Sequence, residues 1–200
     1  MLAAINYADR IASGKPPKDA LYQWSTAIGS AVLFAILASI VVLLAGDDRA
    51  LLALRAPHSW GRALLQMLGV LVLVYVVTGI ASPLLHPGRE QGLTPDHWEP
   101  AYAAAFFANA FAVCVLAPFT EELTFRGLGF SLLRPFAPWI AVVGTAIVFG
   151  LAHGLVEALP ILVVFGLGLA YIRLRQDSIL PGMLLHATFN AIALAVAVTT

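Results

Sequence analysis

Six long apolar runs divide the chain, and most of the segments between them are rich in Pro, Gly or charged residues. The runs cover residues 21–45, 63–85, 101–119, 137–155, 159–174 and 179–198. Each approaches or reaches the roughly 20 apolar residues that a helix needs to cross a bilayer. None alternates between apolar and polar positions as a strand of a membrane barrel does. Because lipid leaves backbone polar groups to be satisfied by helices or closed barrels, the runs predict transmembrane helices.

The pattern therefore predicts an all-α fold, a polytopic transmembrane helix bundle with about six spanning helices. We see no internal repeat and no second domain, so residues 1–200 are interpreted as a single integral membrane domain. Residues 1–20 contain no sustained apolar stretch and do not resemble a cleavable signal peptide. We expect them to form a short extramembrane segment. Residues 86–100 are the most polar connection between two runs.

Composition supports the membrane interpretation. Hydrophobic residues make up 60% of the chain and charged residues 11%, whereas soluble domains carry about 25% charged residues. Eleven basic and eleven acidic residues give a net charge of zero, so no basic excess indicates a nucleic-acid partner. Cys114 is the only cysteine, which excludes an internal disulfide and a cysteine-cluster metal site. It lies in an apolar run, where we expect a small buried residue rather than a nucleophile.

The first group of polar residues in the apolar part of the chain is Glu121, Glu122 and Arg126. Ionisable residues in membrane helices cost free energy and tend to be functional. At about 100° per residue, Glu122 and Arg126 lie one helical turn apart and can pair, while Glu121 points about 100° away from Glu122. This asymmetry is expected if Glu122 and Arg126 are scaffold and Glu121 takes part in chemistry. The alternative is that all three are ordinary charges at a helix end in water.

Two further motifs lie on later runs. Phe149 and His153 are one turn apart on the fourth run, and His186 and Asn190 are one turn apart on the last. Taken alone, His153 is most simply a hydrogen-bonded residue at the membrane interface. His186 and Asn190 could equally form an interhelical hydrogen-bonded pair that holds the bundle together.

The order Glu-Glu-x-x-x-Arg, Phe-x-x-x-His and His-x-x-x-Asn on successive hydrophobic segments resembles the CPBP family of intramembrane proteases. That family includes the CAAX prenyl endopeptidases and the bacteriocin-processing and self-immunity (Abi-type) proteins of bacteria. The similarity covers residues 101–200, which we interpret as the catalytic core, and places the active site among the last four helices. The first two predicted helices show no comparable match.

The resemblance implies that Glu121 and His153 activate a water for attack on a peptide carbonyl. It also implies that His186 and Asn190 stabilise the oxyanion, with site support from Glu122, Arg126 and Phe149. These roles suit the residue types, because fixed donors in a dry site stabilise developing negative charge better than donors in water do. Asn190 does not titrate, so donation suits it better than proton transfer.

We expect no cofactor, but zinc is the alternative. Glu121, His153 and His186 could form a first shell for zinc, with water as the fourth ligand. These ligands would come from three separate helices, and the His-Glu-x-x-His helix of zinc proteases is absent from the sequence.

The leading hypothesis is an intramembrane endopeptidase that acts on a membrane-delivered peptide or protein. In the eukaryotic branch of the family the substrate carries a prenyl group, whereas a compact chain such as this one is more similar to the bacterial branch. We therefore expect a multi-pass protein of a bacterial plasma membrane, with the lipid bilayer and a substrate as partners. The alternatives are a non-catalytic membrane scaffold or regulator of the same fold, and a small proton-coupled transporter. The transporter is disfavoured because the two halves of the chain do not match each other. The sequence makes no prediction of the oligomeric state.

Overall fold

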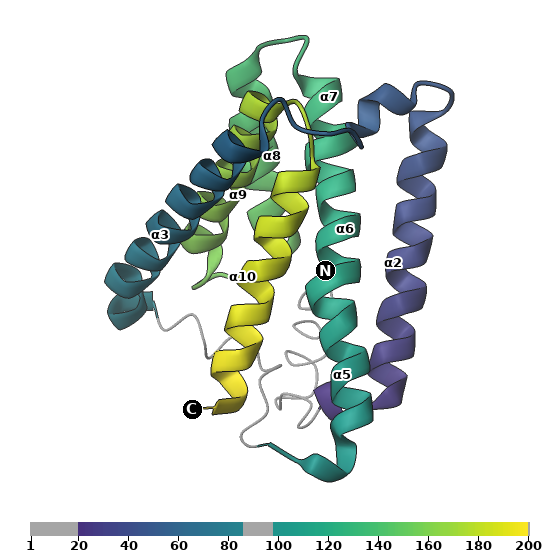
Figure 1. Cartoon of the computed structure of the whole chain (residues 1–200), viewed down its shortest axis with the longest axis vertical. Coiled ribbons are helices and arrows are strands. Elements are labelled where there is room, and N and C mark those ends of the chain that lie inside the picture. Colours follow the sequence, from purple (N-terminus) through teal and green to yellow (C-terminus); the bar gives the residue numbers. More distant parts are fainter. Residues whose placement is uncertain (1–19, 86–97, 200) are drawn as a thin grey trace.

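A computed structural model describes residues 20–85 and 98–199, and this part of the chain is helical without strands (Figure 1). Five helices are long and apolar enough to cross a membrane: Trp24–Ala45 (α2), Trp60–Leu85 (α3), the long helix Pro100–Leu133, Leu159–Gln176 (α9) and Leu180–Val198, within α10 (Leu180–Thr199). The predicted all-α membrane bundle is confirmed. Residues 1–19 and 86–97 lie outside the described part, so the predicted extramembrane segment stays a prediction.

The fourth predicted span is a shorter helix, α8 (Pro138–Ala152), of 15 residues. At 1.5 Å per residue it is about 22 Å long, against a hydrocarbon core of about 30 Å. It ends where His153 caps it and Gly154 turns the chain with φ +64°, in the left-handed region that favours glycine. In Figure 1 the green loop between α8 and α9 stops short of the lower ends of α2, α5 and α10. The C-terminal end of α8 therefore lies within the length of the bundle rather than at its end.

The long helix changes its geometry along its length. It begins with η3 (Pro100–Tyr102) and α5 (Ala103–Phe111), followed by a π-helical segment η4 (Ala112–Leu116), α6 (Ala117–Glu122), a second π-helical segment η5 (Leu123–Gly129) and α7 (Phe130–Leu133). Pro118 lies at the start of α6, where its missing N–H and its ring disturb the preceding turn, and this accounts for the position of η4. Short π segments are frequent at functional sites. Glu121 and Glu122 lie in α6, between the π-helical segments η4 and η5.

The core is formed by α3, α8, α9 and the upper part of α10. Small residues let these helices approach closely, as is typical where lipid provides no hydrophobic drive for association. A Cβ on Gly168 of α9 would lie 2.4 Å from Val70 of α3, and one on Gly166 would lie 3.0 Å from the Ala146 backbone of α8. The central helix α9 thus packs closely against the Val70 side chain of α3 and the backbone of α8.

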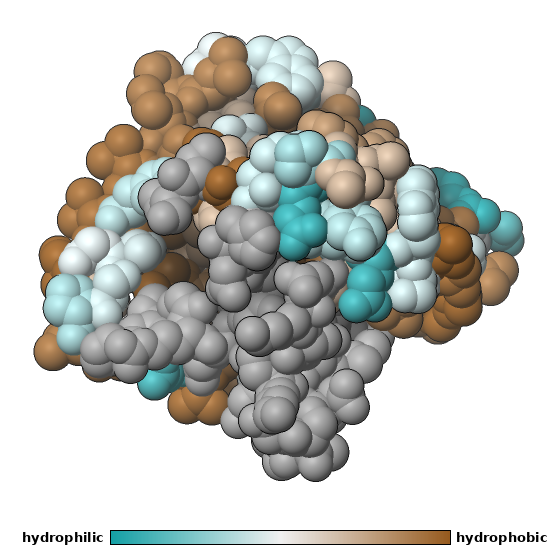
Figure 2. Space-filling view, turned by 90° about the horizontal axis from the view of Figure 1, so that it is seen from below, coloured by the Kyte–Doolittle hydropathy of each residue, from teal (hydrophilic) through white to brown (hydrophobic). Residues whose placement is uncertain are grey.

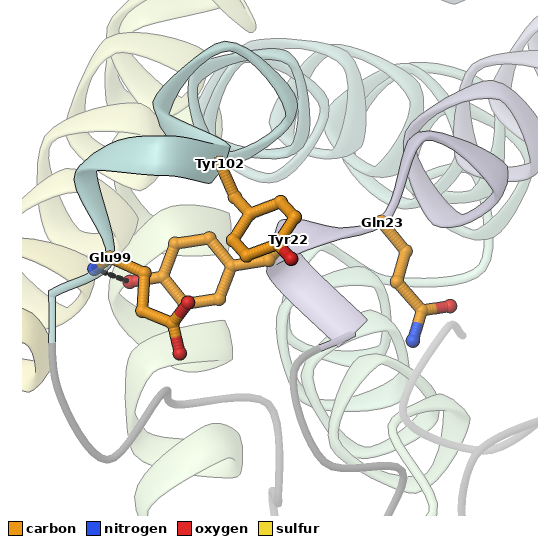
Figure 3. A pocket seen from close by; sticks show the side chains of 4 residues that line it. All are labelled: Tyr22, Gln23, Glu99 and Tyr102. Carbon is orange, nitrogen blue, oxygen red and sulfur yellow. Dashed lines mark hydrogen bonds between the residues drawn. The ribbon is translucent and has the colours of Figure 1, made fainter.

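Large apolar side chains remain exposed on the outer faces of the bundle, where lipid would cover them. Seen from below in Figure 2, they form brown flanks, while hydrophilic residues are visible both near the middle and at the edge of this face. Aromatic residues also concentrate here: Tyr22 lies 5.7 Å from Phe106 and 6.2 Å from Tyr102, ring centre to ring centre. A pocket of about 310 Å³ is lined by Tyr22, Gln23, Glu99 and Tyr102 (Figure 3). It contains none of the predicted catalytic residues.

At the C-terminal end of α9, Asp177 joins three parts of the chain. It caps α9 in a left-handed conformation with φ 52°. Its carboxylate accepts hydrogen bonds from Arg55 at 2.6 Å, Arg134 at 3.2 Å and Arg173 at 2.7 Å. Burial opposes ionisation of this carboxyl, but the hydrogen bond from Arg173 and the charges of the three guanidinium groups outweigh it and hold the pKa of Asp177 below its ordinary value.

Replacing Asp177 by Asn should therefore weaken the fold at neutral pH and reduce its sensitivity to acid. Since the pKa is lower in the folded state, the ionised carboxylate stabilises the fold above the pKa of the unfolded state, and this contribution is lost as the pH falls through the folded pKa. We expect a loss of about 1–2 kcal/mol at pH 7, given the partial exposure of the side chain. The measurement is the unfolding midpoint in mild detergent between pH 7 and pH 3.

A matched control is Asp47→Asn, because Asp47 is exposed in the turn after α2. It should follow the wild-type protein across this range. Identical pH dependence in the wild-type and Asp177→Asn proteins would contradict the assignment.

Candidate active site

Three of the predicted catalytic side chains meet in space although they come from three helices. Glu121 lies near the end of α6, His153 caps α8, and His186 lies in α10. The Oε2 atom of Glu121 is 3.8 Å from Nε2 of His153 and 3.9 Å from Nε2 of His186. One carboxylate oxygen is thus placed between two imidazole nitrogens.

The predicted ion pair between Glu122 and Arg126 is confirmed. Nη1 of Arg126 is 3.1 Å from Oε1 of Glu122, and both side chains are fully buried. Nη2 of Arg126 donates to the carbonyl of Gly166 on α9 at 2.9 Å. The guanidinium also lies 4.4 Å from the ring centre of Phe149, a favourable cation–π contact. Glu122 is therefore neutralised locally, and its neighbour Glu121 is left to face the histidines.

His186 lies between the two glutamates. Its Nδ1 is 3.4 Å from Oε1 of Glu122, while its Nε2 faces Glu121. Phe149 and Phe165 each contact the ring edge-to-face, with ring centres 5.6 Å and 5.3 Å away. Because aromatic walls and carboxylates enclose it on several sides, the ring has a defined orientation.

His153 is oriented by the backbone of its own helix. Its Nδ1 is 2.7 Å from the carbonyl oxygen of Phe149. A carbonyl only accepts hydrogen bonds, so Nδ1 carries the hydrogen in this contact. In the neutral ring the lone pair is then on Nε2, the atom that faces Glu121. His153 therefore presents a proton acceptor to the site.

Unsatisfied polar atoms are concentrated in this cluster. Five buried side-chain atoms in the described residues have no hydrogen-bond partner within the protein, and four belong here: Oε2 of Glu121, Oε2 of Glu122, Nε of Arg126 and Nδ1 of His186. An unsatisfied buried polar atom costs about 1–3 kcal/mol, and native proteins contain few of them. The side chains of Glu121 and His153 retain 14% and 17% exposure, so this costly site is still reachable from outside.

Asn190 has a different neighbour. Its Nδ2 donates to the carbonyl of Val113 in η4 at 2.9 Å, which ties α10 to the first π segment. This hydrogen bond does not involve Glu121, His153 or His186. The second hydrogen on Nδ2 is not used in this bond.

The donors fit zinc by chemistry but not by spacing. In tetrahedral zinc sites the ligand atoms lie about 2.0–2.1 Å from the metal, and so about 3.3 Å from one another. The separations of 3.8 Å and 3.9 Å exceed this value. Throughout the described residues, no group of three or more His, Cys, Asp or Glu side chains is arranged to hold a metal ion.

Sequence reasoning missed Gly182. A Cβ on this residue would lie 2.8 Å from Oε2 of Glu122, so only glycine lets α10 approach the buried ion pair. The available signal was its position, one turn before His186 on the same face of the helix. Arg173 was also missed, because a charge near the end of an apolar run is common.

Comparison with known families bears on this site. A family model described as type II CAAX prenyl endopeptidase, Rce1-like, matches residues 103–192. This stretch runs from the start of α5 into α10 and contains Glu121, His153, His186 and Asn190. No curated protein and no solved structure matches the chain.

Gly182→Ala should destabilise the protein. The added methyl group would meet a carboxylate that cannot move away without breaking its pair with Arg126, and overpacking of this kind costs about 1–3 kcal/mol. The measurement is the thermal unfolding midpoint in detergent. Gly79→Ala in α3 is the control, since a Cβ there would have no atom within 4 Å. Equal midpoints for the two variants would contradict the close approach of α10.

Proposed function

We propose that the chain acts as an intramembrane endopeptidase of the family whose model, described as type II CAAX prenyl endopeptidase, Rce1-like, matches residues 103–192, and we propose a role for each polar residue of the site. Glu121 and His153 activate a water molecule, and His186 and Asn190 stabilise the oxyanion that forms. The observation that carries the proposal is the position of one Glu121 oxygen between the Nε2 atoms of two histidines.

The first step follows from the hydrogen-bonding states of these groups. The Glu121 carboxylate and Nε2 of neutral His153 are both acceptors, and they face each other at 3.8 Å. Two facing acceptors suit a group with two donors, and a water molecule can donate one hydrogen to each. As this water attacks the peptide carbonyl, its oxygen bonds to the carbonyl carbon and one proton passes to Glu121 or His153.

The second step is the collapse of the tetrahedral intermediate. Nε2 of His186 and the second Nδ2 hydrogen of Asn190 are the proposed donors to the oxyanion. When the C–N bond breaks, the proton taken from water returns to the leaving amine. The same groups thus act first as base and then as acid.

Glu122 and Arg126 support the site without touching the substrate. Glu122 faces Nδ1 of His186, and Arg126 neutralises Glu122 and holds it against α9. Phe149 contacts His153, His186 and Arg126 at once, so it separates the cluster from the surrounding apolar core.

The proposed substrate is a peptide or protein that approaches through the membrane. A prenylated C-terminus is the first candidate, because the matched family is described by that activity. The apolar outer faces of the bundle are compatible with a lipid-modified chain arriving from the bilayer.

Glu121→Gln and His153→Ala should each lower the cleavage rate by about 10²–10⁴-fold, the usual contribution of a general base. The measurement is hydrolysis of a quenched fluorescent peptide with a prenylated CAAX terminus, presented in detergent micelles with purified protein. Unfolding midpoints and gel-filtration profiles show whether each variant is folded.

His58→Ala and Asp47→Asn are matched controls, because both residues are exposed in the connection between α2 and α3. They should cleave as the wild-type protein does. Wild-type rates in either Glu121→Gln or His153→Ala would remove that residue from the mechanism.

Metal dependence has a separate test. With the water held by Glu121 and His153, we expect purified, active protein to contain no stoichiometric zinc and to keep its activity in chelator. The measurement is elemental analysis on the same sample used for the cleavage assay. One zinc per chain, with activity lost in chelator and restored by zinc, would replace the proposed mechanism with the zinc-dependent one.

A further inference from the structure

Two arginines in this protein are built into their surroundings in the same way. Arg126 pairs with Glu122, four residues before it in the long helix, and Arg173 pairs with Asp177, four residues after it at the end of α9. The Arg173 contact is 2.7 Å, and its side chain is 2% exposed. Each guanidinium also lies near an aromatic ring, Phe149 at 4.4 Å and Phe130 at 5.1 Å.

Each arginine also donates to the backbone of the element that carries the other. Nη2 of Arg126 donates to the carbonyl of Gly166 on α9, and Nε of Arg173 donates to the carbonyl of Arg126 itself, both at 2.9 Å. The two bonds connect η5 to α9 at points two turns apart on α9. Together they form a reciprocal clasp, which opposes sliding and rotation of one element along the other.

The hydrogen bond from Arg173 ends on a π-helical segment of the long helix. The Arg126 carbonyl lies in η5, where the backbone hydrogen bonds follow the i→i+5 pattern instead of the α-helical pattern. A helix that changes from α-helical to π-helical hydrogen bonding can make this change at more than one residue. A side chain from another helix that donates to one carbonyl, as Arg173 does to Arg126, selects one of these residues. Glu121 and Glu122 directly precede η5, so the selected position determines where their carboxylates point.

We propose that Arg173 is a positioning residue, which fixes η5 along α9 and thereby places Glu121 between His153 and His186. It acts through the backbone and does not contact the reacting atoms. The planar fork of arginine suits this task, because Nε and Nη1 can reach the Arg126 carbonyl and the Asp177 carboxylate simultaneously. The catalytic consequence rests on the proposed function, whereas the clasp can be tested without it.

The structural test is hydrogen–deuterium exchange of the purified protein in detergent, followed for peptides that cover residues 123–129. Arg173→Gln removes both donors, and Arg173→Lys retains the charge beside Asp177 but cannot reproduce the fork. We expect exchange in this segment to rise about tenfold or more in Arg173→Gln, and by a smaller factor in Arg173→Lys. If Arg173→Gln does not fold, the exchange of residues 123–129 in Arg173→Lys tests the clasp instead.

Arg175→Gln is the matched control, because Arg175 lies two residues further along α9 with an exposed side chain. Its exchange should equal that of the wild-type protein. Wild-type exchange over residues 123–129 in the folded Arg173 variants would overturn the clasp.

The catalytic test compares kcat and KM per folded molecule for the same three variants with the prenylated peptide. A displacement of about 1 Å in a reacting group can cost about 10²-fold in rate, so we expect kcat to fall by this order in Arg173→Gln while KM changes little. A residue that only stabilises the fold would lower the unfolding midpoint but leave kcat per folded molecule intact. That result would overturn the positioning role.

The two tests separate the possible failures. If the wild-type protein cleaves no prenylated peptide, the proposed function fails while faster exchange in the variants still supports the clasp. If the wild-type protein cleaves but exchange and kcat in the variants are unchanged, the positioning role of Arg173 fails alone.

Discussion

The buried ion pair between Glu122 and Arg126 governs the arrangement of the whole site. Moving two charges out of water costs several kcal/mol for each ion, and attraction between them compensates only when further contacts satisfy the remaining groups. Although Oε2 of Glu122 and Nε of Arg126 have no hydrogen-bond partner in the protein, the Gly166 carbonyl, the Phe149 ring and His186 all contact the pair. Each comes from a different helix, so satisfying this one pair already brings α8, α9 and α10 into position. The neighbouring Glu121 is then carried to the two histidines.

In a membrane, such polar contacts become more important for deciding which helices associate. Lipid is as apolar as the helix surfaces, so apolar side chains alone do not decide which helices associate. In this protein, close packing at Gly166, Gly168 and Gly182 and a few buried polar groups make the decision together. The glycines set how near the helices come, and the polar groups set their register. Several polar atoms of the site have no hydrogen-bond partner in the protein, so this arrangement costs stability, as is typical of functional sites.

Local periodicity predicted the features that depend on a single helix. The apolar runs correspond closely to the helices, and the spacing of Glu122 and Arg126 predicted their pair, because residues one turn apart are neighbours in any helix. The length of α8 was overestimated, because an apolar run does not reveal that Gly154 adopts a positive φ. The η4 and η5 segments could not be foreseen beyond a disturbance at Pro118. Contacts such as Arg173 with the Arg126 carbonyl join distant parts of the chain, and no local pattern encodes them.

The shortness of α8 has a consequence for how a hydrolase obtains its co-reactant inside an oily layer. A 15-residue helix cannot reach both faces of a bilayer of ordinary thickness. The surrounding lipid must deform toward the turn at Gly154, or solvent must enter there. In both cases bulk water comes nearer to the ring of His153 than the depth of the other helices would suggest. An incomplete span can thus bring water toward the site proposed for catalysis.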